Sequence, residues 1–200
     1  MIKISRLLAI LVLVFFLTGC APQDSLFPLF NNNDTAFEKQ LLGQWKIKAK
    51  DDAHQDPSVN LTLVVFSPGE YENSYDVKIP KANDAGGTMR STARLVRLGA
   101  YLFIDLEMPD TDKFQDIPYP AIADHCFGRL VLTGDTVRID FLDDDWVAKQ
   151  VKAGKLGHSY VNSPDGTLLS ADTPELRKFA LEHAEDHDAF SVSYFLTRNK

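Results

Sequence analysis

Cysteine is scarce in this chain of 200 residues, which contains only Cys20 and Cys126. So few cysteines leave no framework of internal disulfides. The longest apolar run, residues 7–17, is too short for a transmembrane helix, which needs about 20 residues. The chain also lacks a P-loop, a dinucleotide-binding fingerprint and a nucleophile elbow. These absences exclude the enzyme classes that depend on such motifs, and no cofactor is expected.

Basic side chains are outnumbered by acidic ones, with 21 lysines and arginines against 28 aspartates and glutamates. No basic patch is visible along the chain, so nucleic acid is not expected as a partner. The acidic balance favours solubility and carries little information about the fold.

The N-terminal segment has the three parts of a secretory signal. Lys3 and Arg6 precede the apolar run, and the small residue Gly19 closes it just before Cys20. The last four residues, LTGC at 17–20, resemble a bacterial lipobox, the signal that directs lipid onto a cysteine. This resemblance implies diacylglycerol on the Cys20 sulfur, cleavage before Cys20 and acylation of the new N-terminus. Because one acyl chain anchors a protein only marginally, stable anchoring takes two or more chains.

We therefore expect a signal peptide at residues 1–19, a lipidated tether at 20–33 and a single β-barrel domain at 34–200. The tether is predicted because the stretch APQDSLFPLFNNN contains prolines and an asparagine run. The expected location is the bacterial cell envelope, with the protein attached to the membrane through Cys20. In a Gram-negative organism, Ala21 in place of an aspartate implies the outer membrane, facing the periplasm.

Cys126 is then the only free thiol, in an oxidising compartment where an exposed thiol would react. We therefore expect Cys126 to be a buried core residue. A catalytic cysteine would need a nearby base. The neighbouring His125 does not supply one, because adjacent side chains of a strand point to opposite faces.

Alternating apolar and polar residues predict strands along most of the folded unit. Two hairpins can be aligned residue by residue around two-residue turns that begin at Gly99 and Gly134. A glycine in the first position suits a type II′ turn. Both alignments place an arginine directly opposite an aspartate: Arg94 opposite Asp105, and Arg129 opposite Asp140. Since a one-residue slip would lose these pairs and turn the apolar residues outward, the registers are well defined.

Two further patterns predict helices. Thr35 and Glu38 fit a capping box for a short N-terminal helix that Gly43 can end. A second helix starts within the acidic run 143–145 and ends at Gly154. The acidic run could suggest a metal site, but helix capping and the helix dipole explain it more simply.

The last helix is expected to begin at Thr173-Pro174 and to run to about Asp188. His183 and His187 lie one turn apart on its apolar side, and such a pair can hold one metal ion. The order H-E-x-x-H is absent, however. The alternative, which we favour, is that both rings pack against the barrel wall with their nitrogens bonded to backbone or water.

Roughly eight to ten strands with few helices predict an antiparallel barrel or sandwich. We expect the barrel, because a closed sheet leaves no exposed edges. The expected fold is therefore mainly β, an antiparallel β-barrel with a short N-terminal helix and two helices in the C-terminal half.

Gly43-Gln44-Trp45, near the start of the folded unit, resembles the first lipocalin motif, G-x-W. Arg198, on the last strand, stands where such barrels place an arginine across the tryptophan ring, a contact worth about 0.5–2 kcal/mol. The resemblance implies a lipocalin-like (calycin) barrel that Trp45 and Arg198 close at one end. The whole layout is similar to that of bacterial lipoproteins, a likeness that implies no particular activity. The second lipocalin motif, T-D-Y, has no convincing counterpart.

Two functions from different classes remain open. The first is non-enzymatic binding of one small apolar or amphipathic ligand, for which an eight-stranded barrel is just wide enough. The second is a structural or interaction protein of the envelope with a filled barrel, in which a loop such as 109–124 binds another protein. A metal-dependent enzyme using His183 and His187 ranks last. An open apolar cavity in the barrel favours the first function, and continuous packing favours the second.

Overall fold

The computed structural model describes residues 21–31, 33–49, 63–80, 88–108, 124–157, 159–163 and 166–200. The strands are β1 (Asp24–Ser25), β2 (Thr35–Ala36), β3 (Gly43–Ala49), β4 (Leu63–Pro68), β5 (Ser74–Pro80), β6 (Thr88–Leu98), β7 (Tyr101–Met108), β8 (Asp124–Thr133), β9 (Thr136–Phe141), β10 (Tyr160–Ser163), β11 (Gly166–Leu169) and β12 (Val192–Arg198). The helices are α2 (Asp144–Lys152), α3 (Thr173–Glu182) and a 3-10 helix, Lys39–Leu41. Within these ranges, no helix has the length and apolar character needed to cross a membrane.

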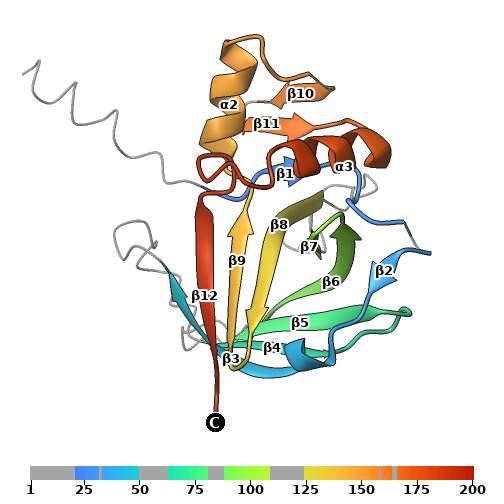
Figure 1. Cartoon of the computed structure of the whole chain (residues 1–200), viewed down its shortest axis with the longest axis vertical. Helices are drawn as coiled ribbons and strands as arrows, with labels where there is room; N and C mark the ends of the chain where they lie inside the picture. The colour runs from blue at the N-terminus through green and yellow to red at the C-terminus, as the bar shows by residue number, and fades with distance from the viewer. Residues whose placement is uncertain are drawn as a thin grey trace, which may run out of the picture.

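Eight of the strands close into an antiparallel barrel in the order β8-β7-β6-β5-β4-β3-β12-β9. The pairing of β8 with β9 completes the ring. In Figure 1, β12 runs down the barrel wall to the C-terminus at the lower end, and α2, α3, β10 and β11 lie together at the upper end. The predicted mainly β fold and antiparallel barrel are therefore confirmed.

The two hairpin registers that the sequence predicts are also confirmed. Arg94 is paired with Asp105 across β6 and β7, and Arg129 is paired with Asp140 across β8 and β9. The turns begin with glycines at positive φ, 56° and 57°. This backbone conformation is the one that the first position of a type II′ turn requires.

Only one of the two arginines keeps the opposite aspartate as its ion-pair partner. The Arg129 guanidinium lies 3.1 Å from the Asp140 carboxylate. Arg94 instead reaches diagonally along the sheet to Glu107, at 3.1 Å. Asp105 is left to bond other groups, because a diagonal neighbour is within reach of a long side chain.

The barrel strands separate two hydrophobic cores, one on each face of the sheet. Buried members of the interior core include Trp45, Phe66, Tyr75, Ile104 and Leu196. The outer core lies between the outside of the barrel and a layer formed by α2, α3 and the N-terminal segment. Its buried members include Leu29, Phe103, Phe127, Leu176 and Phe190.

The N-terminal segment 21–31 belongs to the folded unit. β1 pairs antiparallel with β8 and parallel with β11. Leu29 is fully buried, and its backbone N–H donates to Asp105 Oδ2 at 2.6 Å. The tether interpretation is therefore wrong for these residues, and the folded unit includes the chain from Ala21 to Asn31, which the prediction had left outside it. The signal peptide and the lipidation of Cys20 concern residues outside the described ranges and stay predictions.

The short N-terminal helix is one 3-10 turn, Lys39–Leu41, and the capping box is not formed. Thr35 lies in β2, where its backbone pairs with Val96 of β6. The Glu38 carboxylate lies 3.0 Å from the Arg97 guanidinium and does not cap the turn. The capping-box prediction was wrong because both residues have other partners in the fold.

The two C-terminal helices start with aspartate caps. Asp143 accepts the Trp146 N–H at 3.0 Å at the start of α2, as the acidic run predicted. At the start of α3 the cap is Asp172 rather than Thr173. α3 ends at Glu182, earlier than the predicted Asp188.

The early end of α3 has a local cause. The Asp186 carboxylate accepts the backbone N–H groups of Asp188 and Ala189, at 2.9 and 3.2 Å. A short acidic side chain that bonds nearby backbone donors stabilises a turn in place of a helix.

Candidate functional site

Trp45 of β3 and Arg198 of β12 are register partners near one end of the barrel. Trp45 is fully buried, and its Nε1–H donates to the Leu41 carbonyl at 2.8 Å. The Arg198 guanidinium carbon lies 3.8 Å from the centre of the indole ring. Its terminal nitrogens donate to the carbonyls of Leu42 at 2.6 Å and Gln40 at 2.5 Å. We call this arrangement of Trp45 and Arg198 the floor.

Gly43 is required by the floor on two grounds. Its φ of 118° lies in a region that side-chain-bearing residues rarely adopt. A Cβ atom at this position would lie 2.9 Å from Arg198 Nη1. The spacing of G-x-W thus has a physical reason: the glycine leaves room for the arginine that covers the tryptophan two residues later.

Above the floor, the barrel encloses a cavity of about 270 Å³. Its walls are mainly apolar and include Val64, Phe66, Val77, Ile104 and Phe141. By comparison, an engineered apolar cavity of about 150 Å³ in another protein binds benzene, so this cavity has room for a small apolar group. The interior is therefore not continuously packed.

Two polar side chains of the cavity wall, Cys126 and Tyr194, are neutral at pH 7. Burial raises the pKa of the Cys126 thiol, and the carboxylates of Asp105 and Asp24 raise it further. Burial likewise raises the pKa of Tyr194. Cys126 is 7% exposed, which confirms the prediction of a buried thiol. A protonated, buried thiol is a poor nucleophile.

The end of the cavity opposite the floor, which we call the mouth, is crossed by the N-terminal segment. Pro22 and Asp24 line the cavity there. The Ala21 N–H donates to Asp144 Oδ1 at 3.1 Å, and the Gln23 N–H donates to the Leu142 carbonyl at 2.8 Å. These bonds hold the segment at the rim. The sequence reasoning missed Pro22 and Asp24, because it read this segment as a tether.

The predicted metal pair is not assembled on a helix face. α3 ends at Glu182, so His183 is the C-cap and His187 lies in the following turn. The His183 ring packs against Trp146 and Phe179, with ring centres 5.0 and 4.8 Å apart. The prediction of an i, i+4 pair was wrong because the helix stops before the second histidine.

His125 belongs to a buried network on the outer wall of the barrel. Its Nδ1 lies 2.8 Å from Asp105 Oδ1, and the other oxygen of that carboxylate accepts the Leu29 N–H. The Phe30 ring packs edge-on against the imidazole, with ring centres 6.1 Å apart. The pair thus fixes the N-terminal segment to the barrel.

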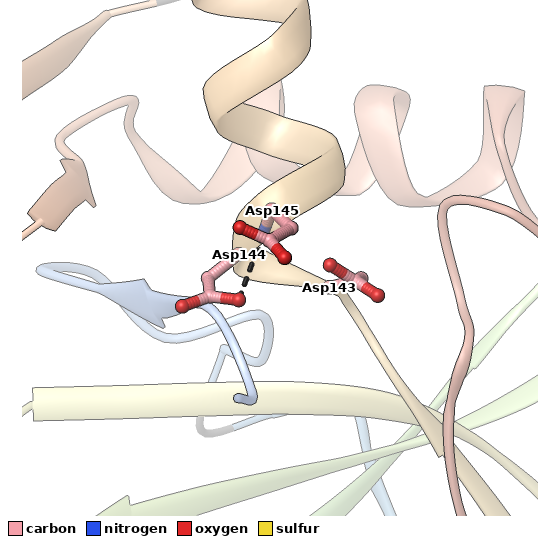
Figure 2. A group of neighbouring side chains, drawn as sticks. All are labelled: Asp143, Asp144 and Asp145. Carbon is pink, nitrogen blue, oxygen red and sulfur yellow. Dashed lines mark hydrogen bonds between the residues drawn. The ribbon is translucent and has the colours of Figure 1, made fainter. Parts of the chain in front are cut away.

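Asp143, Asp144 and Asp145 are the only group of three metal-ligating side chains close together in the ranges that the structure describes (Figure 2). Two of the three already accept backbone bonds: Asp143 caps Trp146, and Asp144 accepts the N–H groups of Ala21 and Asp145. Burial raises the pKa of Asp144, which disfavours further negative charge there. The cluster organises the start of α2 and the N-terminal segment.

Comparisons of the chain with protein-family models, with curated proteins and with solved structures give no match. The functional argument therefore depends on the barrel itself.

Proposed function

We propose that the protein is a lipid-anchored lipoprotein of the bacterial cell envelope whose lipocalin-like barrel binds a small apolar or amphipathic ligand without catalysing a reaction. The observation that carries this proposal is the apolar cavity of about 270 Å³. Each methylene group that a ligand buries there contributes about 0.8 kcal/mol, before the cost of association is subtracted. A cavity of this size suits a ligand that binds and dissociates reversibly.

The floor supports the lipocalin-like part of the proposal. Gly43, Trp45 and Arg198 occupy the relative positions that the first lipocalin motif and its arginine require, and they are in contact. The chain departs from the usual lipocalin plan in placing α2, β10, β11 and α3 before the last strand. These extra elements cover the outside of the barrel and leave the interior free for a ligand.

The position of the mouth supports a link between the ligand site and the membrane. Pro22 lines the cavity, and Ala21 is held at the rim by Asp144. Because consecutive Cα atoms are about 3.8 Å apart, a lipidated Cys20 would lie within about 8 Å of Pro22 along the chain. An anchor there would hold the mouth beside the bilayer, where apolar ligands are found. With Ala21 after the cysteine, a Gram-negative organism would place this bilayer in the outer membrane, on the periplasmic side.

The test is to purify the lipidated protein from envelopes, extract it with organic solvent and identify the extract by mass spectrometry. Lipid attached covalently to Cys20 remains with the protein and does not interfere. We expect about one extracted ligand per barrel. The variant Val77→Phe, which fills the cavity, should lose the ligand.

The matched control is Val131→Phe, because Val131 is 39% exposed on the outer face of β8 and the same side-chain change is made there. It should retain the ligand. A folded wild-type barrel that yields no extractable ligand would contradict the proposed function.

The lipid anchor is tested separately, by measuring the intact mass of the mature chain. An unlipidated N-terminus other than Cys20 would exclude the anchor.

A further inference from the structure

Tyr194 places a hydroxyl group in a cavity wall that is otherwise mainly apolar. Tyr194 of β12 lines the cavity, as does Ile139, its register partner on β9. Leu196, two residues further along β12, also lines the cavity. Since alternate residues of a strand face the same side of a sheet, the Tyr194 side chain faces the barrel interior. Its ring packs edge-on against Phe141, with ring centres 5.9 Å apart.

The Tyr194 hydroxyl is not committed to other groups of the protein. It has no hydrogen-bond partner in the part of the chain that the structure describes. Burial raises the pKa of Tyr194, and the Cys126 thiol raises it further, so the two groups lie within electrostatic reach of each other. A protonated thiol is only a weak donor and a weak acceptor. The Tyr194 hydroxyl therefore keeps an unused donor beside the cavity.

Tyr75, which belongs to the same interior core, shows how a tyrosine serves the fold of this barrel. Its hydroxyl accepts the Glu38 N–H at 2.6 Å and donates to the Glu38 carbonyl at 3.3 Å. Tyr75 does not line the cavity, whereas Tyr194 does. Because polar groups removed from bulk water are normally hydrogen-bonded, the Tyr194 hydroxyl needs a partner from outside the chain. In the empty cavity that partner is water, and in the occupied cavity it is the ligand.

We propose that the Tyr194 hydroxyl donates a hydrogen bond to the ligand, so that the cavity selects a small apolar molecule with an oxygen acceptor, such as a carbonyl or an ether, over a pure hydrocarbon. This inference rests on the proposed function and adds to it the class of ligand and a specificity-determining residue. A hydrocarbon in the cavity would displace water from the hydroxyl without replacing its bond, and an unpaired hydroxyl costs free energy. An acceptor oxygen on the ligand removes this cost.

The expected preference is modest, because Tyr194 is only partly buried. A hydrogen bond between two neutral groups of this kind changes affinity roughly two- to tenfold. Ligands with and without an oxygen atom also differ in hydration, so each ligand is compared with itself on two variants of the protein. The quantity of interest is the coupling between the hydroxyl of residue 194 and the oxygen of the ligand.

The experiment uses two probes of the same shape: acetophenone, and α-methylstyrene, in which a methylene group replaces the carbonyl oxygen. The reference protein is the full mature chain with Cys20→Ser, which needs no detergent that could enter the cavity. Refolding from urea removes any co-purified ligand. Isothermal titration calorimetry gives the affinity of each probe for the reference protein and for Tyr194→Phe. The matched control is Tyr160→Phe, because Tyr160 of β10 is 38% exposed and does not line the cavity.

We expect Tyr194→Phe to weaken acetophenone binding roughly two- to tenfold and to leave α-methylstyrene binding unchanged or slightly tighter. Tyr160→Phe should change neither affinity. In infrared difference spectra, the carbonyl stretch of bound acetophenone should lie at lower wavenumber in the reference protein than in Tyr194→Phe, because a donated hydrogen bond weakens the C=O bond. Without ligand, Tyr194→Phe should unfold at the same temperature as the reference protein.

The contrary outcomes separate this inference from the proposed function. Equal weakening of both probes by Tyr194→Phe, or an unshifted carbonyl stretch, overturns the role of Tyr194 and leaves the proposed function standing. A clear loss of thermal stability in ligand-free Tyr194→Phe overturns it too, because the hydroxyl would then bond the protein itself. If neither probe binds to a folded barrel, or if both bind Val77→Phe as tightly as the reference protein, the inference and the proposed function both fail.

Discussion

The two hydrophobic cores of this protein share the barrel wall but differ in how completely they are filled. In the outer core, Leu29, Leu142, Val147 and Leu176 are fully buried. In the interior core, side chains near the mouth are only partly buried although they face into the barrel: Ile47, Ile79, Met89 and Leu106. One face of the sheet is thus packed for stability. The other leaves apolar side chains beside an open cavity.

The largest difference should appear when a leucine is truncated in each core. Leu176→Ala should lower the free energy of unfolding by about 3–5 kcal/mol, because it creates a new cavity among fully buried side chains. Leu106→Ala should cost only about 1–2 kcal/mol, because Leu106 already borders empty space. Urea denaturation measures both values. Equal losses would show that the two cores are packed alike.

A second prediction tests whether water reaches the interior core at the floor end of the barrel. Tyr75 is fully buried there, and burial raises its pKa from 10.0 to about 12. Between pH 10 and 12 the folded state therefore binds more protons than the unfolded state, so the free energy of unfolding falls as pH rises. At about 1.4 kcal/mol per pKa unit, the loss reaches up to about 3 kcal/mol.

The measurement is the difference between wild type and Tyr75→Phe in urea titrations from pH 8 to 12. The variant loses the bond that the Tyr75 hydroxyl accepts from the Glu38 N–H at 2.6 Å, so it starts less stable. Its stability should then fall less steeply with pH. Parallel curves would mean that the Tyr75 hydroxyl is in contact with water.

Replacing a valine by phenylalanine in each core compares the two cores by adding side-chain volume instead of removing it. Val147→Phe in α2 should cost about 1–3 kcal/mol, because the outer core has no room for the added ring. Val77→Phe should change the free energy of unfolding by less than about 1 kcal/mol, because the ring enters the cavity. Thermal melts of the two variants check this. A larger loss for Val77→Phe would contradict an open interior.

The last prediction concerns the floor. Gly43→Ala should cost about 1–2 kcal/mol, from its positive φ and from the contact with Arg198. When Arg198→Met is also present, the share of this loss that comes from contact with the Arg198 guanidinium should disappear. The share that comes from the positive φ of residue 43 should remain. A double-mutant cycle gives this coupling. Additive losses would show that the guanidinium does not press against Gly43.

The floor and the hairpins could be predicted from the sequence because their signals are local. Gly99 and Gly134 fix two turns, and the charges across them select the register. Gly43 and Trp45 are close in sequence, and Arg198 follows from the resemblance to lipocalins.

The mouth could not be predicted, because its residues are positioned by partners far away in the sequence. β1 is two residues long and depends on Cys126 and Leu169 for its pairing. A strand this short has no readable alternation. The end of α3 was misplaced for a related reason: the apolar pattern continues to Phe190, which is buried from a turn rather than from a helix.

The most direct test of an open interior beside a filled outer core is crystallography under xenon pressure. Apolar cavities that exclude water bind xenon. The account predicts xenon, or a co-purified ligand in its place, inside the barrel between Val64, Val77 and Ile104, and none between α3 and the barrel wall. An interior filled by side chains, or xenon only in the outer core, would contradict it.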